Sequence, residues 1–201
     1  WRSLVGSEMC IRDSFDDNGI VLCSVIRNNN GCLNMYYAGF ELCNKIRYRI
    51  LSGLATSNDG GETFKRFSGV PILERSEQEL FIRGGPFVIK EKNLYKLWYV
   101  SGSKWIDVNG IKSPSYDIRY LESSDGFSWK DNGEKVLSLS KEDEYAFGRP
   151  AIYLNNDNSY RMFYSIRKKS LGAYRLGYAE SKNGKEWIRK DEKLNLDISP
   201  D

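Results

Sequence analysis

The sequence predicts an all-β fold built from a repeated four-stranded unit. An aromatic strand motif occurs three times, at 33–37, 95–99 and 160–164, and a Ser-x-Asp/Asn-Gly turn follows each copy, at 57–64, 123–129 and 181–187. Tyr37, Tyr99 and Tyr164 within these strands lie 62 and 65 residues apart. No segment shows sustained helical periodicity. Repeats of four short strands at regular spacing are typical of propeller blades, so we predict a β-propeller.

The strands of each unit follow one plan. In the second unit, strands are expected at 87–90, 94–100 and 116–123, with a fourth beginning at Trp129. Turns rich in Asn, Asp and Gly separate them, as tight hairpins require. We expect blades at about 15–70, 84–135 and 148–193, with the start of a fourth at 194–201.

The first residues look foreign to the protein. Residues 4–13 match, one for one, a reading frame of a common transposase sequencing adapter. We therefore set residues 1–14 apart and expect residues 15–201 to be a fragment without its true N-terminus. The compartment is consequently left open, although the remaining cysteines, Cys23, Cys32 and Cys43, have no zinc-site spacing and favour a reducing, cytoplasmic location.

Composition narrows the function classes. The formal net charge is only +3 and no basic run is present, which argues against a nucleic-acid partner. No apolar stretch approaches the ~18 residues of a membrane span. The chain contains no histidine, which excludes a Ser-His-Asp triad and a His-ligated metal within it. We predict neither metal nor cofactor, and acid–base chemistry must use carboxylates, Tyr, Lys or Arg.

The four-strand plan also predicts which loops meet. Linkers between units and the loops between second and third strands converge at one end, and the Ser-x-Asp/Asn-Gly turns lie at the opposite end. We therefore interpret these turns as structural and place the candidate site at the first end. Several arginines are expected at this end, and their guanidinium groups either bind planar anions or pair with neighbouring carboxylates. The arginines expected at this end are Arg47, Arg49, Arg83, Arg149, Arg167 and Arg175.

From about residue 15 to 201 the chain resembles the five-bladed propellers of glycoside hydrolase families 43, 32 and 68 and their uncharacterised relatives. The resemblance rests on Asp16-Asp17-Asn18-Gly19, on the aromatic strands and on the turns. It implies about three blades of a five-bladed ring, with one carboxylate at the first strand of each. Asp16 matches the first carboxylate. At the other two positions, in Arg83-Gly84-Gly85-Pro86 and Gly148-Arg149-Pro150, the sequence has glycine instead.

These observations leave three functions open. The first is a carbohydrate-processing hydrolase in which Asp16 or Asp17 acts as base or nucleophile, Glu144 as acid and Glu79 in support. The second is a catalytically inactive propeller that recognises acidic, phosphorylated or nucleotide-linked sugars. The third is a sialidase, because Ser57 to Phe64 fits the Asp-box pattern. The expected partner is a carbohydrate, and the expected binding residues are Arg83, Trp105, Tyr116, Arg149 and Arg167.

Overall fold

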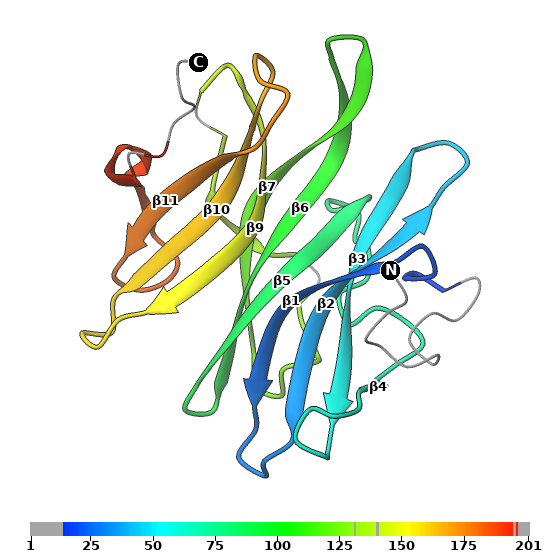
Figure 1. The fold of residues 1–201 in the computed structure, drawn as a ribbon, viewed down its shortest axis with the longest axis vertical. Helices are drawn as coiled ribbons and strands as arrows, with labels where there is room; N and C mark the ends of the chain where they lie inside the picture. The colour runs from blue at the N-terminus through cyan, green and yellow to red at the C-terminus, as the bar shows by residue number, and fades with distance from the viewer. Residues whose placement is uncertain (1–13, 131, 140, 195, 197–201) are drawn as a thin grey trace.

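The computed structural model describes residues 14–130, 132–139, 141–194 and 196, and these form three four-stranded units (Figure 1). The adapter-like residues before 14 and most of the predicted fourth blade lie outside the described residues. The strands are β1 (Ile20–Arg27), β2 (Leu33–Leu42), β3 (Tyr48–Ser57), β4 (Lys65–Arg66), β5 (Ile82–Glu91), β6 (Leu94–Val108), β7 (Ile111–Ser123), β8 (Glu134–Leu137), β9 (Glu144–Leu154), β10 (Tyr160–Lys168), β11 (Arg175–Ser181) and β12 (Ile188–Arg189), followed by the 3-10 turn η1 (Asp191–Leu194).

Within each unit, consecutive strands pair antiparallel, as the alternation of turns predicts. Neighbouring units are joined by short parallel pairings, Ile50 with Ile82 between β3 and β5, and Tyr116 with Ala146 between β7 and β9. The first strands of the units, β1, β5 and β9, therefore lie next to one another in the middle of the molecule (Figure 1).

The second unit departs from the prediction at two places. Its fourth strand is β8, beginning at Glu134, so the prediction of a start at Trp129 was wrong. The Asp125 carboxylate accepts hydrogen bonds from the N–H groups of Phe127 and Ser128, which continues the turn before pairing resumes. The hairpin between β6 and β7 is also longer than predicted, because pairing extends to Val108 and Ile111.

Aromatic side chains of the second strands connect successive units. Tyr36 of β2 is fully buried, and its hydroxyl donates to the carbonyl of Gly126, in the turn of the second unit, at 3.0 Å. Trp98 of β6, also fully buried, donates from its indole to the carbonyl of Gly184, in the turn of the third unit, at 2.8 Å. We call these two bonds the latches. The second and third Ser-x-Asp/Asn-Gly turns therefore each accept a hydrogen bond that joins neighbouring units.

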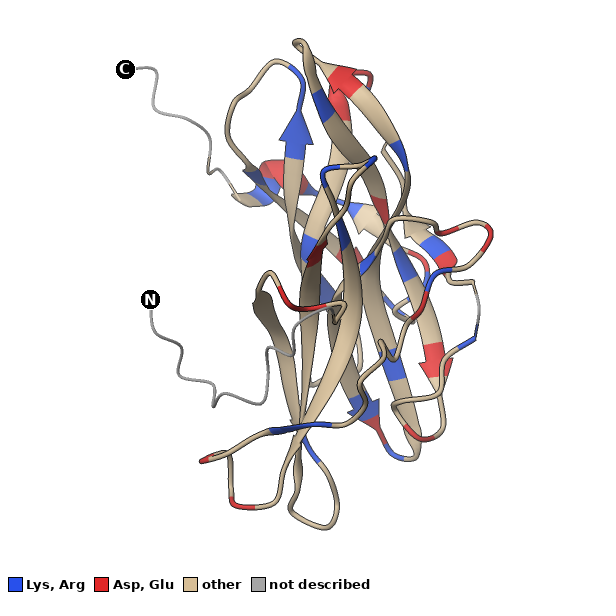
Figure 2. Ribbon diagram, turned by 90° about the vertical axis from the view of Figure 1, so that its right-hand side faces the viewer, with Lys and Arg blue, Asp and Glu red and all other residues tan. Residues whose placement is uncertain are grey.

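Basic and acidic residues alternate along the strands and loops of the ribbon in Figure 2. This distribution agrees with the small net charge of +3. Among the described residues, no helix has the length and apolarity that crossing a membrane requires.

The turn at Asp125 generates a prediction about acid stability. Burial alone would raise the pKa of this carboxyl, but the N–H groups of Ser128 and Phe127 and the Ser123 hydroxyl outweigh burial and lower the pKa to about 2. Because the pKa of Asp125 is lower in the folded chain than its value of about 3.9 in the unfolded chain, the ionised carboxylate stabilises the fold at pH above about 3.9. This stabilisation is lost as the pH falls through about 2 and the carboxyl becomes protonated in the folded chain. Asp125→Asn should therefore lower the melting temperature at pH 7, and the difference from wild type should shrink between pH 4 and 2.

Thermal unfolding monitored by circular dichroism across this pH range measures the effect. Glu134→Gln, which changes an exposed carboxylate outside the turns, is the control. A pH-dependent difference of the same size in Glu134→Gln would contradict the assignment to the turn.

Candidate functional site

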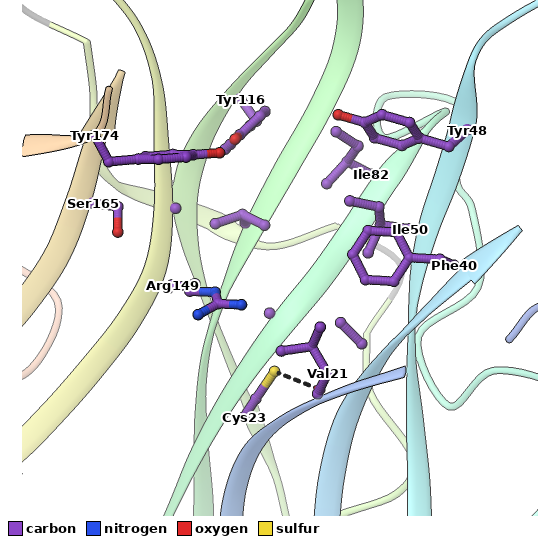
Figure 3. A pocket seen from close by; sticks show the side chains of 14 residues that line it. Val21, Cys23, Phe40, Tyr48, Ile50, Ile82, Tyr116, Arg149, Ser165 and Tyr174 are labelled. Carbon is purple, nitrogen blue, oxygen red and sulfur yellow. Dashed lines mark hydrogen bonds between the residues drawn. The ribbon is translucent and has the colours of Figure 1, made fainter. Parts of the chain in front are cut away.

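A cavity of about 480 Å³ lies between the first strands of the three units, and we call it the central cavity. All three units contribute to its wall (Figure 3). Most of the wall is apolar or aromatic, and Arg149 is the one charged residue among the described residues that line it. The lining residues are Val21, Cys23, Ala38, Phe40, Tyr48, Ile50, Ile82, Gly85, Val100, Tyr116, Gly148, Arg149, Ser165 and Tyr174.

The first strand of each unit contains a β-bulge, and a residue of each bulge lines the central cavity. The pairing register shifts at Cys23 in β1, at Gly85 in β5 and at Arg149 in β9. A bulge leaves a residue unpaired and re-aims its side chain, and bulges are common beside functional sites. The three bulged residues all line the central cavity. Gly85 and Arg149 occupy the same position, each as the first residue of a two-residue bulge that ends in proline, whereas Cys23 is the single unpaired residue of β1 and lies one position later.

Arg149 holds an unfavourable backbone conformation. Its φ is +49°, whereas Gly85, at the equivalent bulge, has φ +63° without a Cβ to clash. A non-glycine residue in the left-handed region costs on the order of 1 kcal/mol and is concentrated at functional sites. The exposed Arg149 side chain points into the cavity toward Cys23 (Figure 3). Arg149 therefore carries both the strained backbone and the one positive charge among the described residues that line the cavity.

Tyrosine hydroxyls supply further hydrogen-bonding groups. Tyr174 reaches across the cavity so that its hydroxyl lies next to Tyr116 (Figure 3). Burial raises the pKa of Tyr116, and Tyr174 raises it further. Burial likewise raises the pKa of Tyr48. The Tyr48 and Tyr116 hydroxyls therefore stay protonated at neutral pH and can both donate and accept.

Cys23 is a thiol rather than a thiolate. Burial raises its pKa to about 11, and Arg149 opposes this only partly. The thiol donates to the Val21 carbonyl at 3.3 Å. Because the thiolate is the nucleophilic form, the wall at Cys23 is a weak polar surface.

The predicted catalytic carboxylate Asp16 lies in a buried network of the first unit. It is 0% exposed and accepts a hydrogen bond from the Tyr37 hydroxyl at 2.9 Å. Arg66, from the outer strand β4, pairs with the same carboxylate at 2.7 Å. Asp16 therefore ties the segment before β1 to both β2 and β4, and it does not line the central cavity.

Glu79 has the corresponding place in the second unit. It is also 0% exposed, and it accepts hydrogen bonds from the Tyr99 hydroxyl at 2.8 Å and from the Gly133 N–H at 3.0 Å. Arg83 and Arg119 pair with it at 3.2 and 3.4 Å. Arg83 is only 2% exposed, so the structure places this predicted sugar-binding residue inside the unit and not in the central cavity.

Glu144 repeats the arrangement in the third unit. Arg189, from the outer strand β12, donates to both of its oxygens at 2.8 and 2.7 Å. Tyr164 donates to Asp191 at 2.8 Å, and Asp191 also pairs with Arg189. Each of the three predicted carboxylates is thus engaged in the network of its own unit. The structure does not bring them together around the central cavity.

Comparisons with known proteins agree with this architecture. No protein-family model matches the chain. Two uncharacterized proteins of Mycobacterium tuberculosis, MT1551 of strain CDC 1551 / Oshkosh and Rv1502 of strain H37Rv, are 30% identical to it over 190 residues. The match covers 94% of this chain and 61% of the length of each relative.

Solved structures share the fold at low sequence identity. A glycoside hydrolase superposes with a TM-score of 0.69 at 18% identity, covering 90% of this chain and 58% of that one. A Bombyx mori GH32 β-fructofuranosidase in complex with sucrose gives 0.61 at 18% identity, covering 83% and 35%. A PL25 ulvan lyase bound to an oligosaccharide of GlcA and Rha3S gives 0.52 at 15% identity, covering 83% and 42%. The fold is a β-propeller. The number of blades in the whole ring remains a prediction.

The remaining predicted site residues lie at the same end of the propeller. Tyr116 and Arg149 line the central cavity, while Trp105 and Arg167 line a neighbouring one. Asp17 is half-buried before β1 and accepts a hydrogen bond from the Asn18 side chain at 2.6 Å. Among the described residues, no group of three or more His, Cys, Asp or Glu side chains could hold a metal ion.

Of the residues that line the central cavity, only Tyr116 and Arg149 were predicted as binding residues. Cys23 was noted only as a cysteine without zinc-site spacing, and Phe40, Tyr48, Ser165 and Tyr174 were not singled out. The signal for Cys23 is its place between Leu22 and Ser24, the point where the first strand of each blade bulges.

The buried networks predict a large loss of stability when a carboxylate is removed. Glu79→Ala leaves Arg83 buried without its partner, so it should lower the free energy of unfolding by about 3–5 kcal/mol. Urea unfolding monitored by tryptophan fluorescence measures this. The control, Glu77→Ala, changes an exposed carboxylate two residues away and should stay within about 0.5 kcal/mol of wild type. Equal stability of the two variants would show that the Glu79 network does not hold the blade.

Proposed function

We propose that this propeller binds an anionic carbohydrate in the central cavity, with Arg149 as the anion contact. The observation that carries the proposal is Arg149 itself, a non-glycine residue held at φ +49° on a bulge and aimed into the cavity. No carboxylate of the described residues lines the cavity to neutralise it. A guanidinium with free donors in a partly enclosed site favours a carboxylate, phosphate or sulfate.

The shape and the walls of the cavity support a sugar as the carrier of that anion. Its volume of about 480 Å³ lies in the range typical of small-molecule sites. Phe40, Tyr48, Tyr116 and Tyr174 present aromatic surface suited to the apolar face of a sugar ring. The tyrosine hydroxyls and Ser165 provide partners for sugar hydroxyls. The solved propellers that share the fold include one in complex with sucrose and one bound to an acidic, sulfated oligosaccharide.

Hydrolysis of a glycosidic bond is the second candidate, favoured by the glycoside hydrolases that share the fold. In this proposal Asp17 or Asp16 is the base or nucleophile, Glu144 is the acid and Glu79 assists. Asp17 is the least engaged of them, because among the described residues it is in no ion pair and accepts a hydrogen bond only from its neighbour Asn18. The other three already accept hydrogen bonds inside their blades.

The variant Arg149→Gly tests the role of Arg149 in ligand binding while leaving the stability of the fold nearly unchanged. Glycine accepts φ +49° without strain but is more flexible in the unfolded chain, so the free energy of unfolding should change by no more than about 1 kcal/mol. Affinity for uronate-, phosphate- or sulfate-bearing oligosaccharides should fall at least about tenfold, as expected when a charged hydrogen bond is lost. Isothermal titration calorimetry against these sugars and their neutral counterparts measures both affinity and selectivity.

Arg161→Ala removes the same charge from an exposed position of β10 outside the cavity, and it should bind like wild type. Raising the salt concentration should weaken the binding of wild type more than that of Arg149→Gly. Equal affinity of wild type for acidic and neutral sugars would overturn the anion proposal.

A turnover assay decides between binding and hydrolysis. With a panel of chromogenic aryl glycosides, binding alone predicts no release above the uncatalysed rate. Hydrolysis predicts release that falls by about 10³-fold or more in Asp17→Asn or Asp16→Asn, because a reacting group is lost. Circular dichroism of both variants checks the fold, since Asp16 is also a buried structural residue.

A further inference from the structure

A second cavity, of about 330 Å³, lies next to the central cavity, and we call it the basic cavity. Three loops of the same end of the propeller form it. They are the β2–β3 loop, the β6–β7 hairpin and the β10–β11 loop. Tyr48 lines both cavities, and its ring meets that of Trp105 edge-on at 5.3 Å. The two cavities are therefore separated by side chains and not by a strand.

Four positive charges and no carboxylate of the described residues line the basic cavity. They are Arg47, Lys112, Arg167 and Lys169. Among the described residues, none of the four is in a salt bridge, whereas many cations elsewhere in the chain are paired. A concentration of unpaired cations in a concave site favours an anion of more than one charge.

Arg167 is held in a fixed position between the cavities. Its guanidinium lies over the Tyr145 ring at 4.9 Å and over the Tyr174 ring at 5.3 Å. Tyr145 lines the basic cavity and Tyr174 the central one. Stacking on two rings restricts the guanidinium, which also interacts with the Tyr116 hydroxyl, and its remaining edge donors can bind an oxyanion.

Two of the loops that form the basic cavity are joined to each other. Asn109, at the tip of the β6–β7 hairpin, donates to the Lys169 carbonyl at 3.1 Å. Asp143, the nearby acid, accepts hydrogen bonds from the N–H and hydroxyl of Ser170, at 2.9 and 2.6 Å. Those bonds lower the pKa of Asp143, and Lys168 and Lys169 lower it further. The cavity is thus built before any ligand binds, which reduces the entropic cost of binding.

Trp105 adds a donor without an acceptor. It lines the basic cavity, and its indole N–H is buried with no hydrogen-bond partner among the described residues. Buried polar groups are satisfied in the great majority of cases, so an orphan donor beside a cavity indicates a missing acceptor. An oxyanion in the basic cavity supplies one.

We propose that the basic cavity binds a tetrahedral oxyanion, a sulfate or phosphate ester, carried by the sugar unit next to the one in the central cavity. Such a group has several peripheral oxygens for Lys112, Lys169, Arg47 and Arg167, whereas a carboxylate has two. The preferred ligand is then a saccharide with anionic groups on successive units. This last step rests on the proposed function of the central cavity, but the oxyanion site does not.

The test uses inorganic phosphate and inorganic sulfate as probes, at constant ionic strength, with tryptophan fluorescence and calorimetry as readouts. Wild type should bind one or both in the millimolar range or tighter, with a change in emission that Trp105→Phe abolishes. Lys112→Ala/Lys169→Ala removes two exposed cations and should weaken binding at least tenfold. Lys182→Ala, an exposed lysine on the turn at the other end of β11, is the control for charge and should bind like wild type.

Arg149→Gly distinguishes the two proposals, because it should keep the oxyanion binding that Trp105 emission reports from the basic cavity even if sugar binding in the central cavity is lost. Saccharides carrying one or two sulfate or phosphate esters then identify the carrier. A gain in affinity from the second ester that the double lysine variant removes supports a sugar ester, and no such gain leaves free phosphate or sulfate as the ligand and overturns the saccharide part. Absence of oxyanion binding at tens of millimolar, or equal loss in Lys182→Ala, overturns the site.

Discussion

The latches between successive blades are the constraint on which the rest of the structure depends. Tyr36 and Trp98 each satisfy a buried polar group by donating to the turn of the next blade. An unsatisfied buried donor costs about 1–3 kcal/mol. A change in the angle between neighbouring units that breaks one of these two hydrogen bonds therefore lowers the stability of the fold. Because the angle between units sets the distance between β1, β5 and β9, the latches and the parallel pairings of β3 with β5 and of β7 with β9 together fix the shape of the central cavity.

The carboxylates at 16, 79 and 144 connect the layers within a blade. Each joins the segment before or at the start of a first strand to a tyrosine or an arginine farther out in the sheet. A buried ion pair adds little net stability over apolar packing, but its geometry permits few alternatives. We therefore assign these networks the role of specifying where the first strand begins, which in turn determines which residue is placed on the bulge.

Much of the fold was predictable from the sequence, whereas most of the site was not. The spacing of aromatic strands and turns is a property of the chain's repeated pattern, and the all-β propeller class that it predicts is confirmed. The sequence also indicated a structural role for the predicted carboxylates. Asp16, Glu79 and Glu144 lie 63 and 65 residues apart, close to the 62 and 65 residues that separate the tyrosines. A residue repeated with the blade is more consistent with blade structure than with a single active centre. The left-handed backbone of Arg149 and the loop contacts around Trp105 depend on tertiary packing, which no local pattern encodes.

The recurring bulge also bears on how such proteins diversify. The bulges place a thiol at Cys23, a glycine at Gly85 and a guanidinium at Arg149 on the wall of the central cavity, with Cys23 one position later in its strand than the other two. The side chain there is unpaired in the ladder and makes few demands on the surrounding sheet. Substitution at Cys23 changes the chemistry of the cavity wall without a left-handed backbone to accommodate, whereas at Gly85 and Arg149 any residue other than glycine carries a backbone cost on the order of 1 kcal/mol. Each of the three units contributes one such residue to the wall of the central cavity, so a single substitution at Cys23, Gly85 or Arg149 changes the polar groups offered to a ligand by one unit at a time.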